Sequence, residues 1–312
     1  MIATVTLNPS LDEWMHLASL RMGRLNRATG FARYPGGKGV NVSRVIRTLG
    51  GRTVAFGLAG GEDGLILREL MNRLALPHRF VTVPGPTRNN YKIVTDRPQA
   101  LTEINLEGPR IRASMLRALW RQLTTARPRP RCAVLSGSLP PGAPAATYGR
   151  WIAALRRLGV PPLLDSSGPP LRLGLAARPW MVKPNRHEAE ELLGRPVRSR
   201  RAELRAVPQL LVRGPALVIL SLGAEGALLG RASPPGLWEA RAPAVAVDSA
   251  VGAGDSLVGG FLAGWASGRS LEEAFRLGVA SGTATAMTPG TELCRLADVR
   301  RLLRRVTIRR IV

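Results

Sequence analysis

Short apolar segments alternate with longer segments of helical periodicity along most of the 312-residue chain. In the longer segments apolar residues recur every three or four positions, which is typical of amphipathic helices. Strands that alternate with helices favour a parallel, helix-covered sheet, because parallel neighbours need a crossover connection. The predicted strands are 2–7, 53–58, 132–135, 162–165, 180–183, 217–221 and 242–247, and the predicted helices are 36–49, 63–74, 115–125, 145–158, 185–193, 254–265 and 271–286.

Two segments depart from this alternation. Residues 20–34 alternate weakly without a helical period, and 88–105 resemble a polar hairpin, so both predict strands of a small second sheet. Every second side chain of a strand shares a face, which would bring Arg88, Asn90 and Lys92 together. That face could receive a phosphate, or the hairpin could simply be solvated. The basic tail after residue 298 is expected to form a surface helix or strand.

The segment Asp248–Trp265 joins a glycine turn, a carboxylate and a helix. Gly252 and Gly254 allow a sharp turn free of side chains, so the backbone amides of residues 252–255 can point at one oxyanion. Asp255, in the first helical turn, can accept the proton of an attacking hydroxyl in phosphoryl transfer. The alternative is a glycine-rich helix start with an aspartate at a favoured N-terminal position.

A second glycine turn, Gly36–Asn41, opens another helix. Lys38 and Asn41 would project from its first turn toward an anionic or hydroxylated ligand, or the turn could only cap the helix. Asp12 follows the first strand, and we expect it in a loop at the carboxyl edge of the sheet, where open parallel sheets bind ligands. It could accept a sugar hydroxyl, or it could be a turn residue or helix cap.

Further candidates follow later strands at the same edge. Ser138 and Asp165 come after two of these strands. Asn185 and Glu188 have the spacing of a capping box, and the alternative is that Glu188 organises Mg²⁺ through water. The turn Ser221–Gly226 could bring a nucleotide close to the backbone. Small residues in the last long predicted helix could let a flat base lie alongside, or serve helix packing alone.

Composition limits the classes of partner. The formal net charge is +24, from 45 Lys and Arg against 21 Asp and Glu, but arginine is spread along the whole chain. We therefore expect an anionic small substrate and no nucleic-acid partner. The only lysines are Lys38, Lys92 and Lys183, each in a segment already described. Two distant cysteines, no leader-like start and no long apolar run predict a cytoplasmic protein without disulfides or a membrane segment.

Seven motifs, in this order, resemble those of the ribokinase/PfkB superfamily of carbohydrate kinases, in particular its phosphofructokinase and tagatose-6-phosphate kinase branch. The motifs are Thr6–Asp12, Gly36–Asn41, Thr87–Asn90, Ser136–Gly142, Val182–Asn185 with Glu188, Ser221–Gly226 and Val251–Asp255. The resemblance implies a single ribokinase-like domain over 1–312. It would have three α/β/α layers around a mostly parallel sheet, and a small β lid formed by about 9–34 and 87–105.

The resemblance also implies ATP- and Mg²⁺-dependent phosphoryl transfer to a sugar phosphate. By motif position, Asp255 would be the base, with the amides of Gly252, Ala253 and Gly254 as anion hole. The sugar side would comprise Asp12, Gly37, Lys38, Asn41, Arg88, Asn90 and Ser138. The nucleotide side would comprise Lys183, Asn185, Ser221, Gly223, Gly226, Val247, Val279 and Thr283. Glu188 would bind Mg²⁺ through water, and a K⁺ site like that of some relatives would lie at Ser249, Val251, Thr285, Thr288 and Gly290.

The acceptor sugar stays open at this point. The resemblance implies a phosphofructokinase that forms fructose 1,6-bisphosphate from fructose 6-phosphate or fructose 1-phosphate. The alternatives are a tagatose-6-phosphate kinase, a kinase for an unphosphorylated sugar or nucleoside, and a non-enzymatic protein that senses sugar phosphates or binds nucleic acid. The resemblance further implies a homodimer formed through the lid.

Overall fold

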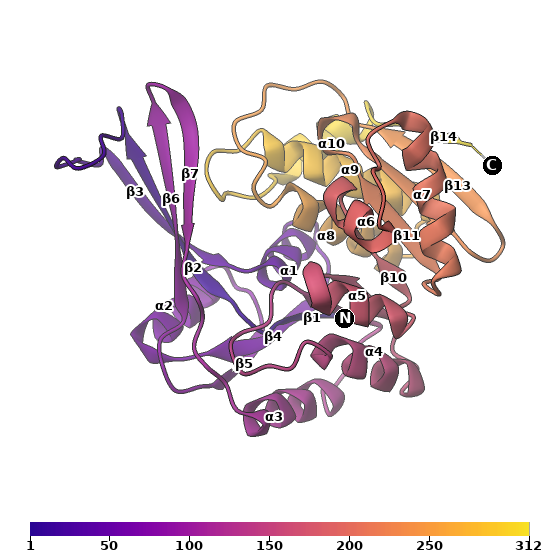
Figure 1. Ribbon diagram of the computed structural model, residues 1–312, viewed down its shortest axis with the longest axis horizontal. Coiled ribbons are helices and arrows are strands. Elements are labelled where there is room, and N and C mark those ends of the chain that lie inside the picture. The colour runs from indigo at the N-terminus through magenta and orange to yellow at the C-terminus, as the bar shows by residue number, and fades with distance from the viewer. Residues whose placement is uncertain (312) are drawn as a thin grey trace.

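The computed structural model describes residues 1–311, so the last residue of the predicted basic tail lies outside the described residues. A large twisted sheet forms the centre of the molecule (Figure 1). Its strands, in spatial order, are β14 (Thr307–Arg310), β13 (Gly236–Arg241), β12 (Ala227–Arg231), β11 (Leu217–Ser221), β10 (Met181–Val182), β9 (Pro162–Asp165), β8 (Cys132–Ser136), β1 (Ile2–Thr6), β4 (Thr53–Ala59) and β5 (His78–Thr82).

The strands from β11 to β5 run parallel, and β12, β13 and β14 extend the sheet antiparallel at one edge. The register aligns the ends of three neighbours. Thr6 of β1 is paired with Ser136 of β8, and Ser136 is paired with Asp165 of β9. Each is the last residue of its strand, so three polar side chains form a row at the carboxyl edge.

Helices cover both faces of the sheet. One face carries α3, α4, α5, α6 and α7, and the other carries α1, α8, α9 and α10. Alternation within the strands explains this, because Ala3 and Val5 of β1 pack on the first face while Ile2 packs on the second. The helices are α1 (Lys38–Thr48), α2 (Gly61–Arg73), α3 (Ala113–Thr124), α4 (Thr147–Arg157), α5 (Gly168–Ala176), α6 (Arg186–Leu193), α7 (Arg200–Val212), α8 (Ala253–Ala266), α9 (Leu271–Ala286) and α10 (Leu296–Leu303).

A separate four-stranded sheet projects from this body (Figure 1). Its strand order is β3 (Gly30–Gly36), β2 (Ser10–Leu17), β6 (Arg88–Asp96) and β7 (Gln99–Asn105). Here β2 pairs with β3 antiparallel and with β6 parallel, so the small sheet joins two distant parts of the chain. The predicted architecture, three layers around a mostly parallel sheet with a small second sheet, is confirmed.

Some predicted elements were wrong. Residues 20–34 were predicted to form strands of the small sheet, but the strand there, β3, begins only at Gly30, and 20–29 form no strand. No strand forms over 242–247, where Pro243 lacks an amide proton and Val247 is 57% exposed. Asp12 lies within β2 and not in a loop or at a helix cap, because the chain enters the small sheet directly after Pro9. No sequence pattern predicted β5, α5, α7, β12 or β13. Prolines account for two of these, since they open α5 and interrupt α7.

The basic tail folds as α10 and β14, so both a helix and a strand are present there. Among residues 1–311, no helix combines the length and the apolar character needed to cross a membrane.

Candidate active site

The glycine turn before α8 has the conformation that its sequence predicts. Gly252 has φ of 78°, in the left-handed region, and a Cβ atom there would lie 2.7 Å from Leu293 Cδ2. Only glycine fits such a position without strain. The amide of Ala253 donates to the Ala250 carbonyl at 3.3 Å, while the next amides belong to a helical first turn, where amides lack intrahelical acceptors. The anion hole itself stays a prediction.

Asp255 lies in that first turn and is 7% exposed. Asn41 Nδ2 donates to its Oδ2 at 2.9 Å, which joins the start of α8 to the start of α1. Burial and the negative charge of Asp165 raise the pKa of Asp255 to about 6. A carboxylate with a pKa close to neutrality can accept a proton and release it again, as a general base must.

Asp165 is the centre of the charged groups in this region. Its Oδ1 accepts from Lys38 Nζ at 3.0 Å and lies 3.5 Å from Lys183 Nζ. Its Oδ2 is buried without a protein partner. Burial would raise the pKa of the Asp165 carboxyl, but the Lys183 and Lys38 ammoniums hold it below its ordinary value. In return, Asp165 raises the pKa of Lys38.

Sequence reasoning placed Asp165 at this edge but gave it no role among the site residues. Its role depends on lysines from α1 and from the end of β10, which no local pattern brings together. The one available signal was the retention of lysine in an arginine-rich chain, and two of the three lysines do meet here.

The small sheet holds a second buried carboxylate. Asp12 accepts three hydrogen bonds, from Ser10 Oγ at 2.8 Å, Asn90 Nδ2 at 3.1 Å and Lys92 Nζ at 3.0 Å. Lys92 is buried and faces the same way as Asn90 and Arg88, as the alternation predicted. This face is therefore not a solvated hairpin, and the charge of Lys92 is used to hold Asp12.

Arg88 and Ser138 approach each other through Asn8, a residue that sequence reasoning missed. Arg88 donates from Nε to the Asn8 carbonyl at 3.3 Å and from Nη1 to Asn90 Oδ1 at 3.0 Å. The Asn8 side chain donates to Ser138 Oγ at 3.1 Å, while its own Oδ1 is buried without a partner. The small sheet and the carboxyl edge of the large sheet thus meet at polar groups.

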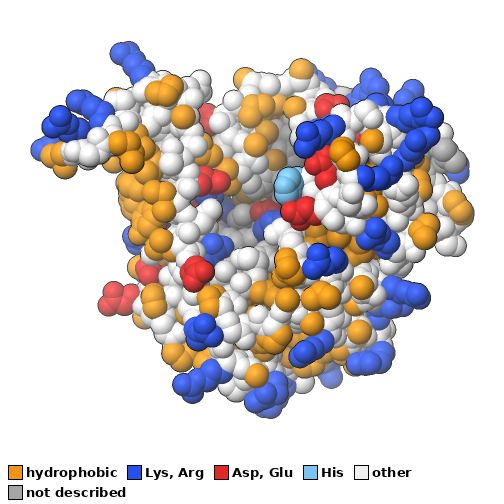
Figure 2. Space-filling view, in the orientation of Figure 1, with side chains coloured by type: hydrophobic (Ala, Val, Ile, Leu, Met, Phe, Trp, Pro, Cys, Tyr) orange, Lys and Arg blue, Asp and Glu red, His pale blue; other side chains and the backbone are white. Residues whose placement is uncertain are grey.

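The start of α1 packs tightly on the ends of β1 and β8. Gly37 has φ of 105°, and a Cβ on it would lie 2.7 Å from Thr6 Cγ2. A Cβ on Gly39 would lie 2.5 Å from Thr6 Oγ1 and 2.9 Å from Ser136 Oγ. Both hydroxyls are buried without partners, and such groups in native proteins usually meet water or a ligand. Figure 2 shows the surface hollowed between the small sheet and the body, with acidic and basic side chains inside.

On the other side of Asp255, Lys183 lies beside the glycine turn, because a Cβ on Gly254 would be 3.5 Å from its Nζ. The capping box that starts α6 is confirmed. Asn185 Oδ1 accepts from the Glu188 amide at 2.8 Å, and Glu188 Oε2 accepts from the Asn185 amide at 2.9 Å. The other oxygen of Glu188 lies 4.0 Å from Lys38 Nζ, so it faces the same region as Asp165.

The turn after β11 passes close to β13. Ser221 Oγ donates to the Pro184 carbonyl at 3.4 Å, and a Cβ on Gly226 would lie 2.1 Å from the Ala240 carbonyl oxygen. The space beside Gly223 is open instead. Val279 and Thr283 are buried one turn apart on α9, whereas Val247 is exposed. The nucleotide roles of these residues stay predictions.

The structure brings the predicted K⁺ residues to the end of α9. The amides of Asp248 and Ser249 donate to the Ala286 carbonyl at 2.9 and 3.3 Å. The Val251 amide donates to Ser249 Oγ at 3.3 Å. The hydroxyls already have protein partners, since Thr285 Oγ1 donates to Ser256 Oγ at 2.7 Å and Thr288 Oγ1 donates to the Thr285 carbonyl at 2.7 Å. Gly290 packs against Trp14 of the small sheet.

Comparison with known proteins agrees with this geometry. The model of the pfkB family carbohydrate kinases matches residues 5–298. The chain is 38% identical to a 1-phosphofructokinase of Bacillus subtilis, over 94% of this chain and 95% of that protein. It is 34% identical to ATP-dependent 6-phosphofructokinase isozyme 2 of Mycobacterium tuberculosis, over 96% of this chain and 88% of that protein. The chain also resembles two crystal structures of phosphofructokinase-2 from Escherichia coli, one in complex with substrates and products and one in complex with potassium. Each superposes with a TM-score of 0.92 at 32% sequence identity, and the match covers 97% of this chain and 98% of the other.

Proposed function

Since the chain belongs to the pfkB family of carbohydrate kinases and is an ATP-dependent sugar-phosphate kinase, we propose that its preferred acceptor is fructose 1-phosphate and its product fructose 1,6-bisphosphate. The main observation in favour of phosphoryl transfer is the position of Asp255, a buried carboxylate with a raised pKa in the first turn of α8. The similarity to a 1-phosphofructokinase over almost the whole chain favours this acceptor. Fructose 6-phosphate is the second candidate, because of the likeness to phosphofructokinase-2.

In this proposal Asp255 takes the proton of the attacking hydroxyl. Asn41 holds the carboxylate through its 2.9 Å hydrogen bond, which leaves the other oxygen, Oδ1, to accept the proton. The free amides of the α8 first turn, with the helix dipole behind them, stabilise the negative charge on the transferred phosphoryl group. Lys183, next to Gly254, adds a positive charge on the nucleotide side.

The donor set fits Mg²⁺, which the kinase family uses together with ATP. Mg²⁺ prefers carboxylate oxygens and retained water, and the buried, unpartnered Oδ2 of Asp165 and the free oxygen of Glu188 offer such positions. When bound, Mg²⁺ would neutralise phosphate charge. Glu188 would act through water, as the resemblance implies, and would use Oε1, because Oε2 is taken by the capping box.

The sugar phosphate would lie between the small sheet and the body. Asp12, fixed by three donors, would accept sugar hydroxyls, and Lys38, which donates to Asp165, would lie between the sugar and the transferred phosphoryl group. Arg88 and Ser138, joined through Asn8, would receive the phosphate already on the sugar. The guanidinium of Arg88 and the ammonium of Lys38 would give this end of the site its positive charge.

A coupled assay of ADP release tests the proposal with four acceptors: fructose 1-phosphate, fructose 6-phosphate, tagatose 6-phosphate and fructose. We expect the highest kcat/KM with fructose 1-phosphate and no measurable turnover with fructose. A higher kcat/KM with fructose 6-phosphate would select the second candidate. Turnover restricted to fructose or a nucleoside would contradict the proposal.

We also propose a K⁺ requirement, since the loop at 248–251 and the end of α9 supply several backbone carbonyls and hydroxyls beside the α8 turn. The potassium complex of phosphofructokinase-2 supports this. K⁺ would bind mainly to carbonyl oxygens, because Thr285 Oγ1 already accepts from the Cys294 amide as well as donating to Ser256 Oγ. Replacing K⁺ by Na⁺ at constant ionic strength is expected to lower kcat. An unchanged rate would rule the requirement out.

The small sheet supports the proposal of a homodimer. All residues of β7 are exposed, and among them Leu101 and Ile104, with Phe31 of β3, leave large apolar side chains in water. Figure 2 shows hydrophobic side chains gathered on the projecting sheet. Such surfaces are typical of protein contacts. Sedimentation equilibrium should give a dimer for the native chain and a monomer for Ile104→Glu, and a monomeric native chain would contradict the proposal.

A further inference from the structure

Arg44 lies one turn after Asn41 on α1, outside the set of residues that the resemblance assigns to the site. Its Nη1 donates to Asn41 Oδ1 at 3.2 Å and to the Pro35 carbonyl of β3 at 3.3 Å. Its guanidinium carbon also lies 5.9 Å from the centre of the Tyr34 ring. One side chain therefore contacts both the residue that holds Asp255 and the strand that leads out of the small sheet.

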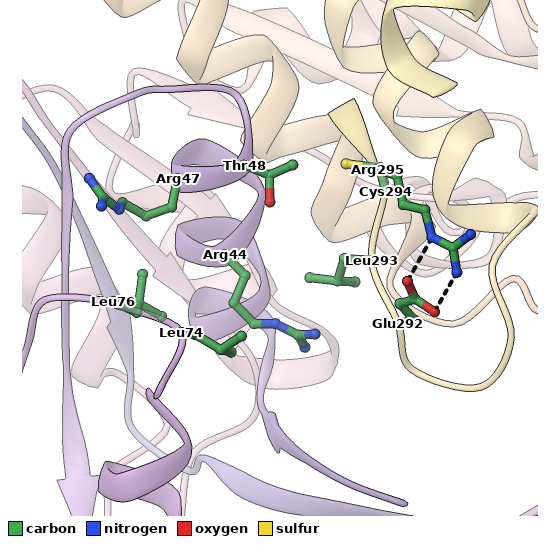
Figure 3. Close-up of a pocket in the computed structure, with 9 residues that line it drawn as sticks. All are labelled: Arg44, Arg47, Thr48, Leu74, Leu76, Glu292, Leu293, Cys294 and Arg295. Carbon is green, nitrogen blue, oxygen red and sulfur yellow. Dashed lines mark hydrogen bonds and ion pairs between the residues drawn. The ribbon is translucent and has the colours of Figure 1, made fainter. Parts of the chain in front are cut away.

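The side chain of Arg44 borders a cavity of about 430 Å³ between α1 and the loop before α10. Figure 3 shows it reaching from α1 toward that loop, where Glu292 forms an ion pair with Arg295. Glu292 is taken by Arg295, and within residues 1–311 no carboxylate is paired directly with Arg44. Arg47, one turn further along α1, borders the same cavity and is exposed.

The contact matters because an asparagine side chain has two different ends. Its oxygen only accepts hydrogen bonds and its nitrogen only donates them. A guanidinium can only donate, so the end of Asn41 that faces Arg44 must be the oxygen. The nitrogen is then the end that faces the carboxylate of Asp255. If the amide turned over, its oxygen lone pairs would face a negative charge.

We propose that Arg44 is a positioning residue for phosphoryl transfer, which fixes the Asn41 amide so that its nitrogen donates to Asp255. This inference rests on the proposed role of Asp255 as base. It gives the reaction a contribution from a side chain that touches neither substrate nor nucleotide. It also makes the alignment of the base depend on β3, since the same guanidinium group holds Pro35.

The charged groups around Asp255 and Arg44 decide which measurement can detect the positioning role of Arg44. Asp255 faces Asp165, Lys38 and Lys183 as well as the Asn41 amide, and these charges stay in place when Arg44 is changed. Arg44 faces Asp12, Tyr34, Cys294 and Glu292, and burial lowers its pKa to about 10, so it remains charged at neutral pH. Loss of its donor group should therefore act on Asp255 through the orientation of Asn41.

The test compares Arg44→Met with Arg47→Met, a matched control on the same helix and the same cavity. We expect Arg44→Met to move the acid limb of the kcat profile upward by about one pH unit, which lowers kcat about tenfold at pH 5 and about twofold at pH 7. The KM for the sugar phosphate should stay within about twofold. Arg47→Met should leave both unchanged. Arg44→Lys, which keeps a donor-only cation, should recover part of the native profile.

A second readout does not depend on turnover. The ¹³Cγ resonance of Asp255, assigned by its loss in Asp255→Asn, reports the pKa of this carboxyl directly, and Arg44→Met should raise it. An unmoved resonance in a folded Arg44→Met protein would overturn the inference, as would an effect on KM alone, which would mean that Arg44 only holds β3. If the native enzyme turns over no fructose phosphate, the proposed function fails, while the titration still decides the role of Arg44.

Discussion

Asp165 and Asp255 are both buried at the carboxyl edge of the large sheet, yet their surroundings move their pKa values in opposite directions. Asp165 faces two ammonium groups, from Lys38 and Lys183, and is held ionised. For Asp255, burial and the charge of Asp165 outweigh the opposing effects of Lys38, the Asn41 amide and Lys183, so its pKa rises to about 6. Two residues of the same type therefore acquire different chemistry.

The difference assigns different tasks. A carboxylate that stays ionised can hold cations and orient lysines, whereas one that is close to protonation at neutral pH can exchange a proton with substrate. The two are also linked, because the charge on Asp165 is one reason why Asp255 is basic enough to act. Changing each carboxylate separately should therefore give distinct outcomes.

The largest expected effect is on turnover in Asp255→Asn. An amide has nearly the same shape as the carboxylate but cannot accept the proton, so kcat should fall by about 10²- to 10⁴-fold. The KM values should change little. Steady-state ADP release with the preferred fructose phosphate measures both, and circular dichroism checks the fold. A loss of less than tenfold would remove Asp255 from the role of base.

Asp165→Asn tests the other side of the comparison. Without the carboxylate, Lys38 and Lys183 would be left near each other with no full negative charge between them, so unfolding in urea should become easier by about 3 kcal/mol. The pKa of Asp255 should also fall, because a like charge is gone. Unchanged stability together with an unchanged acid limb of kcat would contradict the proposed link between the two residues.

The sequence could predict which residues lie at the carboxyl edge of the large sheet, but not which role each of them has. Apolar alternation predicted the sheet, and the glycine turns predicted where α1 and α8 begin, because these depend on neighbouring residues. The pairing of Lys92 with Asp12 joins residues 80 positions apart, and that of Lys38 with Asp165 joins residues 127 apart. No local pattern contains such contacts. A local pattern also could not show that Asp12 would lie inside a strand that pairs with β6.

The pH dependence of stability sharpens the comparison further. The folded pKa of Asp255 lies above its ordinary value of 3.8, so ionising it costs the folded state free energy. The stabilising contribution is present below about pH 4 and is lost as the pH rises through about 6. Asp255→Asn avoids this cost and should be more stable than the native chain at pH 7.5, by on the order of 2 kcal/mol.

The measurement is the free energy of unfolding of both proteins from pH 4 to pH 8. The two curves should lie closest at the acid end and separate between pH 4 and pH 6. If the variant were equally or less stable at pH 7.5, burial of an ionised Asp255 would not be costly, and the argument for its raised pKa would fail.

The smallest expected effect concerns a third buried carboxylate, Asp12, which has one lysine where Asp165 has two. Lys92→Met would leave Asp12 with Ser10 and Asn90 as donors, so the carboxylate would be held less firmly under the sugar. The KM for the fructose phosphate should rise about tenfold with kcat nearly unchanged, since Asp12 is proposed to hold the sugar and not to move the proton. Glu103→Gln is the matched control, because Glu103 lies 4.0 Å from Lys92 on the exposed side and should not alter KM. A fall in kcat with constant KM would instead give Lys92 the same kind of role as Lys38, and the distinction between the small sheet and the body would no longer hold.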